Sequence, residues 1–306
     1  MSLIKKKNEI VLSQKIKGML YGEPGIGKST LALSMPAPVL LFDFDNGISR
    51  VQAEYRTDTV QLKSLQEFKE VLHNEDLSEY KSFVIDGFGK YIERIYNEML
   101  KTGKKSQQTW GKTLEEFKEI NLLLNDMPQH ICYVAHQKAR KTGEGENDKF
   151  GVDGSGSAKD YLIGELDYVG YMEMLGRKRS VSFSPSEKFY AKNSIGIDDY
   201  LEVPVLKEGD ANTFLADVIV NPTIKRRQEE SLELIEQENL VKQGMELINS
   251  LKDNPNECLA KFKEMNLNLY NKKKLFENLK KATTFVFNEK TKTFDKVDNG
   301  KQNVAK

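Results

Sequence analysis

Short apolar segments alternate with segments of helical periodicity along the first two thirds of the chain. Four apolar runs have the length of buried strands and end in polar or turn-forming residues: 16–21, 38–47, 81–89 and 130–138. Segments with helical spacing follow them at 28–35, 64–73, 90–100 and 113–125. Strands that alternate with helices predict an α/β fold, with a mostly parallel sheet and helices on both faces.

The pattern changes after residue 167 and again after Pro222. Strand-like segments separated by turns are expected to extend the sheet at one edge: DYVGYMEML, RKRSVSFSP and KFYAKNSIG. Beyond Pro222 the chain is heavily charged and helical in period. We therefore expect a core over residues 1–222, a helical C-terminal region over 223–282, and a hairpin with a disordered tail over 283–306.

Composition narrows the class of protein. The 306 residues are 39% hydrophobic and 30% charged, which suits one α/β domain with an appendage. The formal net charge is zero, so any surface for nucleic acid must be local. Cys132 and Cys258 lie far apart and predict no disulfide framework or zinc site. Without an apolar signal core or a run of roughly 18 apolar residues, we expect a cytoplasmic protein with no membrane partner.

The glycine-rich stretch YGEPGIGKST carries the first chemistry. It fits G-x-x-x-x-G-K-[ST] with Gly22, Gly27, Lys28 and Ser29 at the fixed positions, between a strand and a helix. Such a loop aims backbone N–H groups at a phosphate, while the lysine reaches the β- and γ-phosphates and the serine ligates Mg²⁺. We expect ATP and Mg²⁺ as cofactors. The candidate nucleotide-binding residues are Gly22, Glu23, Pro24, Gly25, Ile26, Gly27, Lys28, Ser29 and Thr30.

Acidic residues end two of the other apolar runs. Asp86 closes FVID, where a carboxylate joins Ser29 in holding Mg²⁺; the alternative is a turn-forming role before Gly87. Asp43 and Asp45 end LFDFD. Either one could activate the attacking water, and either could instead serve a turn or a helix cap.

These motifs, in this order over residues 15–205, resemble the core of RecA-type ATPases. More closely, they resemble the phage-encoded RecA-like proteins that act as single-strand annealing recombinases. The resemblance implies a RecA-like P-loop NTPase core and makes Asp45 the catalytic carboxylate, although the family more often has Glu there. It also implies that Gln137 in VAHQK senses the γ-phosphate, with His136 where RecA has Asn, and that Lys192 in FYAKNSIG reaches the nucleotide of a neighbouring subunit.

The same resemblance implies two DNA-binding loops, at residues 101–112 and 138–156. Their cations are candidates for single-stranded DNA: Lys104, Lys105, Arg140, Lys141 and Lys149. Trp110 has two interpretations, because it is either a platform for base stacking or part of a helical core stripe with Leu114, Phe117 and Leu124. Acidic residues in the second loop offset its charge, so a solvated loop without DNA is the alternative there.

The leading hypothesis is an ATPase, stimulated by single-stranded DNA, that acts in phage recombination or annealing. It would form a ring or filament of identical subunits in the cytoplasm of a phage-infected or prophage-carrying bacterium, with a single-strand binding protein as a further partner. An AAA-type loader or remodeller is the alternative, but those ATPases usually place Glu directly after the second acidic strand's Asp, where this chain has Gly87. A small-molecule kinase is the third hypothesis. Against it, we see no Arg-rich lid segment in this sequence that would clamp a transferring phosphoryl group. A nucleotide-gated scaffold with negligible turnover is the fourth hypothesis.

Overall fold

The computed structural model describes residues 10, 12–101, 107–140, 149–154 and 156–296. The chain divides into two compact units, one over Ser13–Lys225 and another that contains the residues from Arg226 onward. Each unit has its own hydrophobic core. Nucleotide-site candidates all fall in the first unit.

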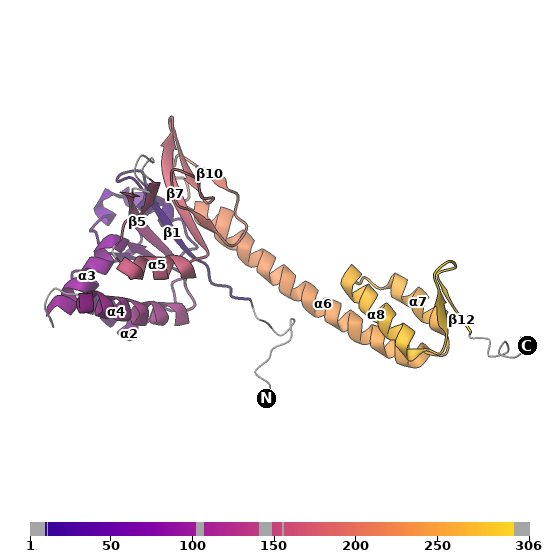
Figure 1. Ribbon diagram of the computed structural model, residues 1–306. Coiled ribbons are helices and arrows are strands. Elements are labelled where there is room, and N and C mark those ends of the chain that lie inside the picture. The colour runs from indigo at the N-terminus through magenta and orange to yellow at the C-terminus, as the bar shows by residue number, and fades with distance from the viewer. Residues whose placement is uncertain (1–9, 11, 102–106, 141–148, 155, 297–306) are drawn as a thin grey trace, which may run out of the picture. The chain divides into compact units, whose positions relative to one another are not determined.

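A ten-stranded sheet forms the centre of the first unit (Figure 1). Its parallel part has the order β7-β1-β5-β4-β2-β3. The bounds of these strands are β1 Lys17–Gly22, β2 Val39–Asp43, β3 Asp58–Gln61, β4 Ser82–Asp86, β5 His130–Arg140 and β7 Tyr168–Leu175. The antiparallel strands are β8 (Lys178–Ser182) beside β7, β10 (Tyr200–Val203) beside β8, β6 (Lys149–Val152) beside β5, and β9 (Lys192–Asn193) beside β7. The expected α/β class and the mostly parallel sheet are confirmed.

Alternating side chains of the strands build a core on each face of the sheet. In β1, Met19 and Tyr21 pack into one core and Leu20 into the other. The first core is covered by four helices, seen along one face in Figure 1: α2 Leu65–Asn74, α3 Phe88–Lys101, α4 Gln107–Asp126 and α5 Gly156–Glu165. The second is covered by α1 (Lys28–Ala32) and by the segment around the π-helical turn Ala216–Val220.

Two expected loops are wrong in part. The segment 101–112 is helical from Gln107 onward, so Trp110 lies on α4, where its ring stacks on Tyr96 of α3 at 4.2 Å. Its side chain is 39% exposed, because the neighbouring helix covers only one face of the ring. The segment 138–156 is not a free loop either: β5 continues to Arg140 and pairs with β6 through register partners such as Lys138 and Gly151.

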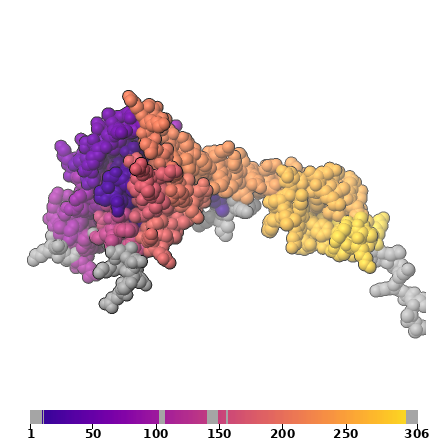
Figure 2. Space-filling model, turned by 90° about the horizontal axis from the view of Figure 1, so that it is seen from above, coloured from indigo at the N-terminus to yellow at the C-terminus, as the bar shows by residue number. Residues whose placement is uncertain are grey.

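The C-terminal unit is a small helical module closed by a hairpin. It contains α6 (Asn221–Leu251) from Arg226, α7 (Pro255–Glu264), α8 (Leu269–Ala282), β11 (Val286–Asn288) and β12 (Thr293–Asp295). Its core joins all three helices to the hairpin through Ile248, Cys258, Phe262, Leu275, Leu279 and Phe294. Figure 2 shows α7, α8 and the hairpin, light orange to yellow, packed as one body. No helix in the described part of the chain combines the length and the apolarity that crossing a bilayer requires.

Replacing Gly18 with Ala should destabilise the protein, because the new Cβ would overlap the ring of Tyr168. That ring is fully buried and has no room to move. We expect the free energy of unfolding to fall by about 1–3 kcal/mol. The control is Gly111→Ala in α4, which meets no atom within 4 Å and should gain about 0.5–1 kcal/mol from helix propensity. Thermal denaturation measures both, and equal melting temperatures would contradict the packing at Gly18.

Candidate nucleotide-binding site

The loop between β1 and α1 has the geometry of a phosphate cradle. Gly25 and Gly27 adopt φ values of 80° and 99°, which side chains other than glycine rarely tolerate. The helix starts immediately afterward, because the N–H of Leu31 donates to the carbonyl of Gly27 at 3.0 Å. The backbone therefore turns sharply enough to point successive N–H groups into the space ahead of α1.

Lys28 lies at the base of this loop and is only 6% exposed. Its ammonium donates to the carbonyl oxygens of Gly22, at 3.1 Å, and Glu23, at 2.6 Å. Burial lowers the pKa of Lys28, while the carboxylates of Asp86, Asp45 and Glu23 act in the opposite direction. Lys28 is thus held by the backbone of its own loop, and carboxylates of other segments lie near enough to act on its pKa.

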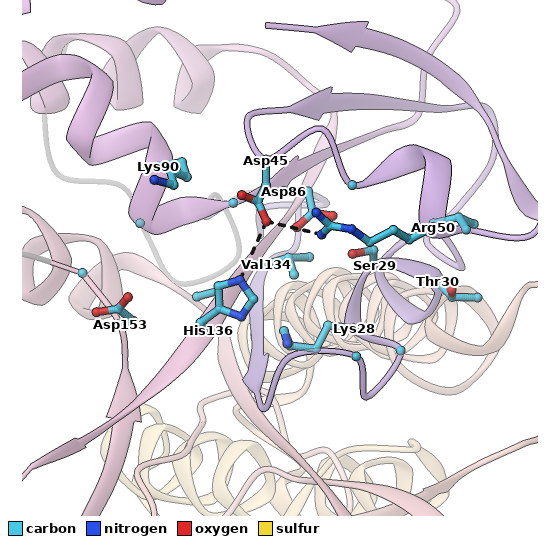
Figure 3. A pocket seen from close by; sticks show the side chains of 18 of the residues that line it. Lys28, Ser29, Thr30, Asp45, Arg50, Asp86, Lys90, Val134, His136 and Asp153 are labelled. Carbon is cyan, nitrogen blue, oxygen red and sulfur yellow. Dashed lines mark ion pairs between the residues drawn. The ribbon is translucent and has the colours of Figure 1, made fainter. Parts of the chain in front are cut away.

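A cavity of about 430 Å³ opens in front of Lys28. Figure 3 shows Lys28, Ser29, Asp45, Asp86 and His136 converging on it from the P-loop and from the ends of separate strands. Of the nucleotide-binding candidates, those that line it are Gly25, Gly27, Lys28, Ser29 and Thr30. Gly22, Glu23, Pro24 and Ile26 belong to the same loop but do not line the cavity.

Asp86 is the last residue of β4 and is 7% exposed. Burial raises the pKa of its carboxyl; the hydroxyl of Ser29, through a hydrogen bond, lowers it, and the nearby Asp43 and Asp45 raise it further. A carboxylate in such surroundings is stabilised by a cation. A carboxylate and a hydroxyl are hard oxygen donors, so the pair Ser29 and Asp86 fits Mg²⁺ that is also bound by phosphate oxygens.

Asp43 and Asp45 have different surroundings, although they are two residues apart. Asp43 is fully buried, and its carboxylate accepts from the backbone N–H groups of Asp45 at 3.2 Å, Gly47 at 2.9 Å and Ile48 at 3.0 Å. Asp45 instead lines the cavity with a side chain that is 27% exposed. Asp43 therefore organises the turn, and Asp45 is the acid that solvent reaches.

Gly87, the residue after Asp86, leaves room for Asp45 beside the cavity. Gly87 has φ +88°, and a Cβ built on it would lie 3.0 Å from the Cβ of Asp45. The backbone on both sides is fixed, because Phe44 N–H donates to the Asp86 carbonyl at 3.0 Å and Gly87 N–H to the Val134 carbonyl at 3.2 Å. A side chain at position 87 would adopt a strained backbone conformation and would crowd Asp45.

Several cavity residues were not identified as site candidates from the sequence. His136 Nε2 lies 3.8 Å and Arg50 Nη1 3.7 Å from Asp45 Oδ2, as the dashed lines in Figure 3 show. Lys90 and Asp153 also line the cavity. Successive side chains of a strand point to opposite sides, so His136 of β5 faces Asp45 while Gln137 points away from it. For Arg50, which follows a short turn, the sequence offers no comparable signal.

Other candidates lie outside the cavity. Gln137 donates to the carboxylate of Glu23 in the P-loop at 3.4 Å. Lys192 lies on β9, and its ammonium donates to the carbonyls of Ile163 and Gly164 at the end of α5, both at 2.9 Å. Lys149 begins β6 and lines a different, smaller hollow. Lys104, Lys105, Lys141 and the side chain of Arg140 lie outside the described residues.

The contrast between the two acids gives a stability prediction. In Asp43→Asn the amide NH₂ replaces an acceptor and faces a backbone N–H, so a buried hydrogen bond is lost. We expect a loss of about 1–3 kcal/mol in unfolding free energy, measured by denaturant titration. Asp45→Asn, on the same segment, is the control and should change it by less than about 0.5 kcal/mol. The reverse order would mean that Asp45, not Asp43, holds the turn.

Comparisons with known proteins follow this geometry. No curated protein matches the chain. Among solved structures, a KaiC-like protein from the hyperthermophilic archaeon Pyrococcus horikoshii is 13% identical, with a TM-score of 0.36, and the alignment covers 62% of this chain and 89% of that one. The RadB recombinase is 12% identical, with a TM-score of 0.36, over 55% of this chain and 79% of that one.

A protein-family model described as "AAA domain" matches residues 14–195. This range is more than half of the 306 residues and contains every residue that lines the cavity. It also contains the P-loop, both acidic strand ends and the β5–β6 pair. The chain therefore belongs to the AAA domain family.

Proposed function

We propose that this protein binds and hydrolyses ATP with Mg²⁺, and that it acts on single-stranded DNA in phage recombination or annealing. The observation that supports it most is the convergence of Lys28, Ser29, Asp86 and Asp45 on one cavity, from three separate segments. A binding loop alone would explain Lys28. The two acids at neighbouring strand ends are what hydrolysis needs in addition.

Each residue has a distinct task in this proposal. Lys28 contacts the β- and γ-phosphate oxygens, while Ser29 and Asp86 hold Mg²⁺, which neutralises charge between those phosphates when it is bound. Asp45 orients the attacking water and accepts its proton, since its carboxylate faces the cavity rather than the backbone. His136 lies beside that carboxylate and positions it.

DNA enters the proposal through β5. This strand carries His136 to the cavity and Gln137 to the P-loop, and then continues to Arg140 and the partner strand that begins at Lys149. If the phosphate backbone of DNA bound β5 near Arg140, the strand would shift and would change the positions of His136 and Gln137. Gln137 is thus proposed as the sensor that couples DNA to turnover. The further cations proposed for DNA are Lys104, Lys105 and Lys141.

The test is ATP hydrolysis measured with and without single-stranded DNA. Lys28→Ala should lose about two orders of magnitude or more, and Asp86→Asn should keep nucleotide binding but lose turnover. Lys178→Ala is the matched control, because Lys178 is exposed, paired with Glu202 at 2.9 Å and absent from the cavity. Near-normal hydrolysis by Lys28→Ala would refute the site. Hydrolysis without stimulation by DNA would refute the DNA part alone.

Lys192 is proposed to act on the nucleotide of a neighbouring subunit in a homo-oligomer, where a cation stabilises charge on the γ-phosphoryl oxygens. Lys192→Met should be inactive alone, as should Lys28→Ala, and mixing them should restore part of the activity by pairing an intact P-loop with an intact lysine. Melting temperatures are measured in parallel, because Lys192 also bonds the end of α5. A fully active Lys192→Met protein, or an inactive mixture of co-assembled subunits, would exclude the role.

A loader or remodeller of AAA type is the second candidate, because the family that matches bears the description "AAA domain". It predicts stimulation of hydrolysis by a protein partner rather than by DNA. Gly87 weighs against its usual arrangement, since the acid near the cavity comes from β2 and not from the position after Asp86.

A further inference from the structure

The part of the C-terminal module that follows α6 has a charge balance unlike that of the whole chain. Residues 255–296 contain ten lysines and five acidic residues, whereas the complete sequence has 46 basic and 46 acidic residues. This excess of positive charge belongs to α7, α8 and the hairpin, which share one core. None of these lysines lines the nucleotide site, because all of its lining residues lie between Gly25 and Gly154 in the sequence.

Four of the five acidic side chains in residues 255–296 already have partners. Glu257 pairs with Lys261 at 3.1 Å, Glu277 with Lys280 at 3.4 Å, and Glu289 with Lys292 at 2.9 Å. Asp295 accepts a hydrogen bond from Asn288 at 2.9 Å. The lysines that remain are therefore not neutralised by these acids.

Three of the remaining lysines gather on one face of α8. Lys273, Lys274 and Lys281 follow Tyr270 at spacings of three, four and eleven residues, which places all four side chains along one stripe of the helix. Within residues 10–296 where the structure is described, none of these lysines has an ion pair. Tyr270 is 75% exposed. These four residues are called the α8 face below.

The opposite face of the same helix is fully used. Leu275 and Leu279 are completely buried in the core of the module, and Phe276 packs against Phe287 of the hairpin. Of the large aliphatic side chains of α8, only Leu269 is exposed, at 84%, and one such residue is too little apolar surface for insertion into a lipid surface. What it offers is a row of cations over about 12 Å of helix length, with an aromatic ring beyond one end of the row.

We propose that the α8 face binds the phosphate backbone of single-stranded nucleic acid and that Tyr270 stacks on a base. Unpaired lysines gain the most from phosphates, because binding releases the counterions that condense on the strand. An exposed aromatic ring accepts any base, which suits a contact without sequence preference. This contact shares its ligand with the proposed function but not its site, and it requires neither ATP nor the β5–β6 strands.

The experiment measures binding of a labelled oligothymidylate to the full chain, without nucleotide, over a range of salt concentrations. Lys273→Gln with Lys274→Gln should weaken binding by about tenfold and flatten the plot of log K against log salt by about 1.4 units, at roughly 0.7 for each lost contact. The matched control is Lys261→Gln with Lys292→Gln, which removes the same charge from paired lysines of the same module. An equal slope change in both variants would overturn the proposal, because it would show a general field instead of a site.

Tyr270→Leu tests the ring separately. It keeps an apolar side chain on the helix and should weaken binding at least about fivefold, with unchanged far-ultraviolet circular dichroism. Poly-glutamate as competitor distinguishes nucleic acid from any polyanion: displacement as effective as by unlabelled oligonucleotide would overturn the proposal. If the ATPase proposal failed, the binding results for the α8 variants would still stand. If DNA stimulated hydrolysis but all α8 variants bound the oligonucleotide normally, the proposal for the α8 face alone would be refuted.

Discussion

The site depends on one geometric constraint, the parallel register of four neighbouring strands. β1, β4 and β2 end at one edge of the sheet, beside residues 134–136 of β5, with Gly22 opposite His136 and Asp86 opposite Val134 and Asp43. Because the carboxyl ends of parallel strands meet at one edge, a buried ammonium and several carboxylates come together there without a long loop to carry them. Burial lowers the pKa of Lys28 there, and the carboxylates of Asp86 and Asp45 act against that effect.

That constraint also decided what could be predicted from the sequence. Apolar runs that end in Asp and a glycine-rich loop before a helix are local signals, so β1, β2, β4 and the P-loop could be found by reading along the chain. The choice between Asp43 and Asp45 could not be made, because it depends on which carboxylate receives the backbone N–H groups of Gly47 and Ile48. Nothing in the residue types distinguishes an acid that holds a turn from one that faces a cavity.

Other differences have equally physical causes. β3 and α5 were not expected, since DTVQ is short and half-exposed and α5 has a weak apolar stripe. The strand β5 was expected to end near Lys138, but pairing with β6 carries it to Arg140. His136 acquires its place only because β5 alternates toward the cavity at that residue. For β5 and His136 a partner distant in sequence determined the outcome, and a single chain pattern cannot show such a partner.

The close approach of Gly87 and Asp45 has a consequence for how sites of this kind can diverge. Two placements of an acid compete for one volume: on the turn after β2, or on the residue that follows the last Asp of β4. With 3.0 Å between Asp45 Cβ and the position of a Cβ at residue 87, and with φ +88° at that residue, a side chain at position 87 strains the backbone and crowds Asp45. Positions 45 and 87 should therefore vary together, as a coupled pair.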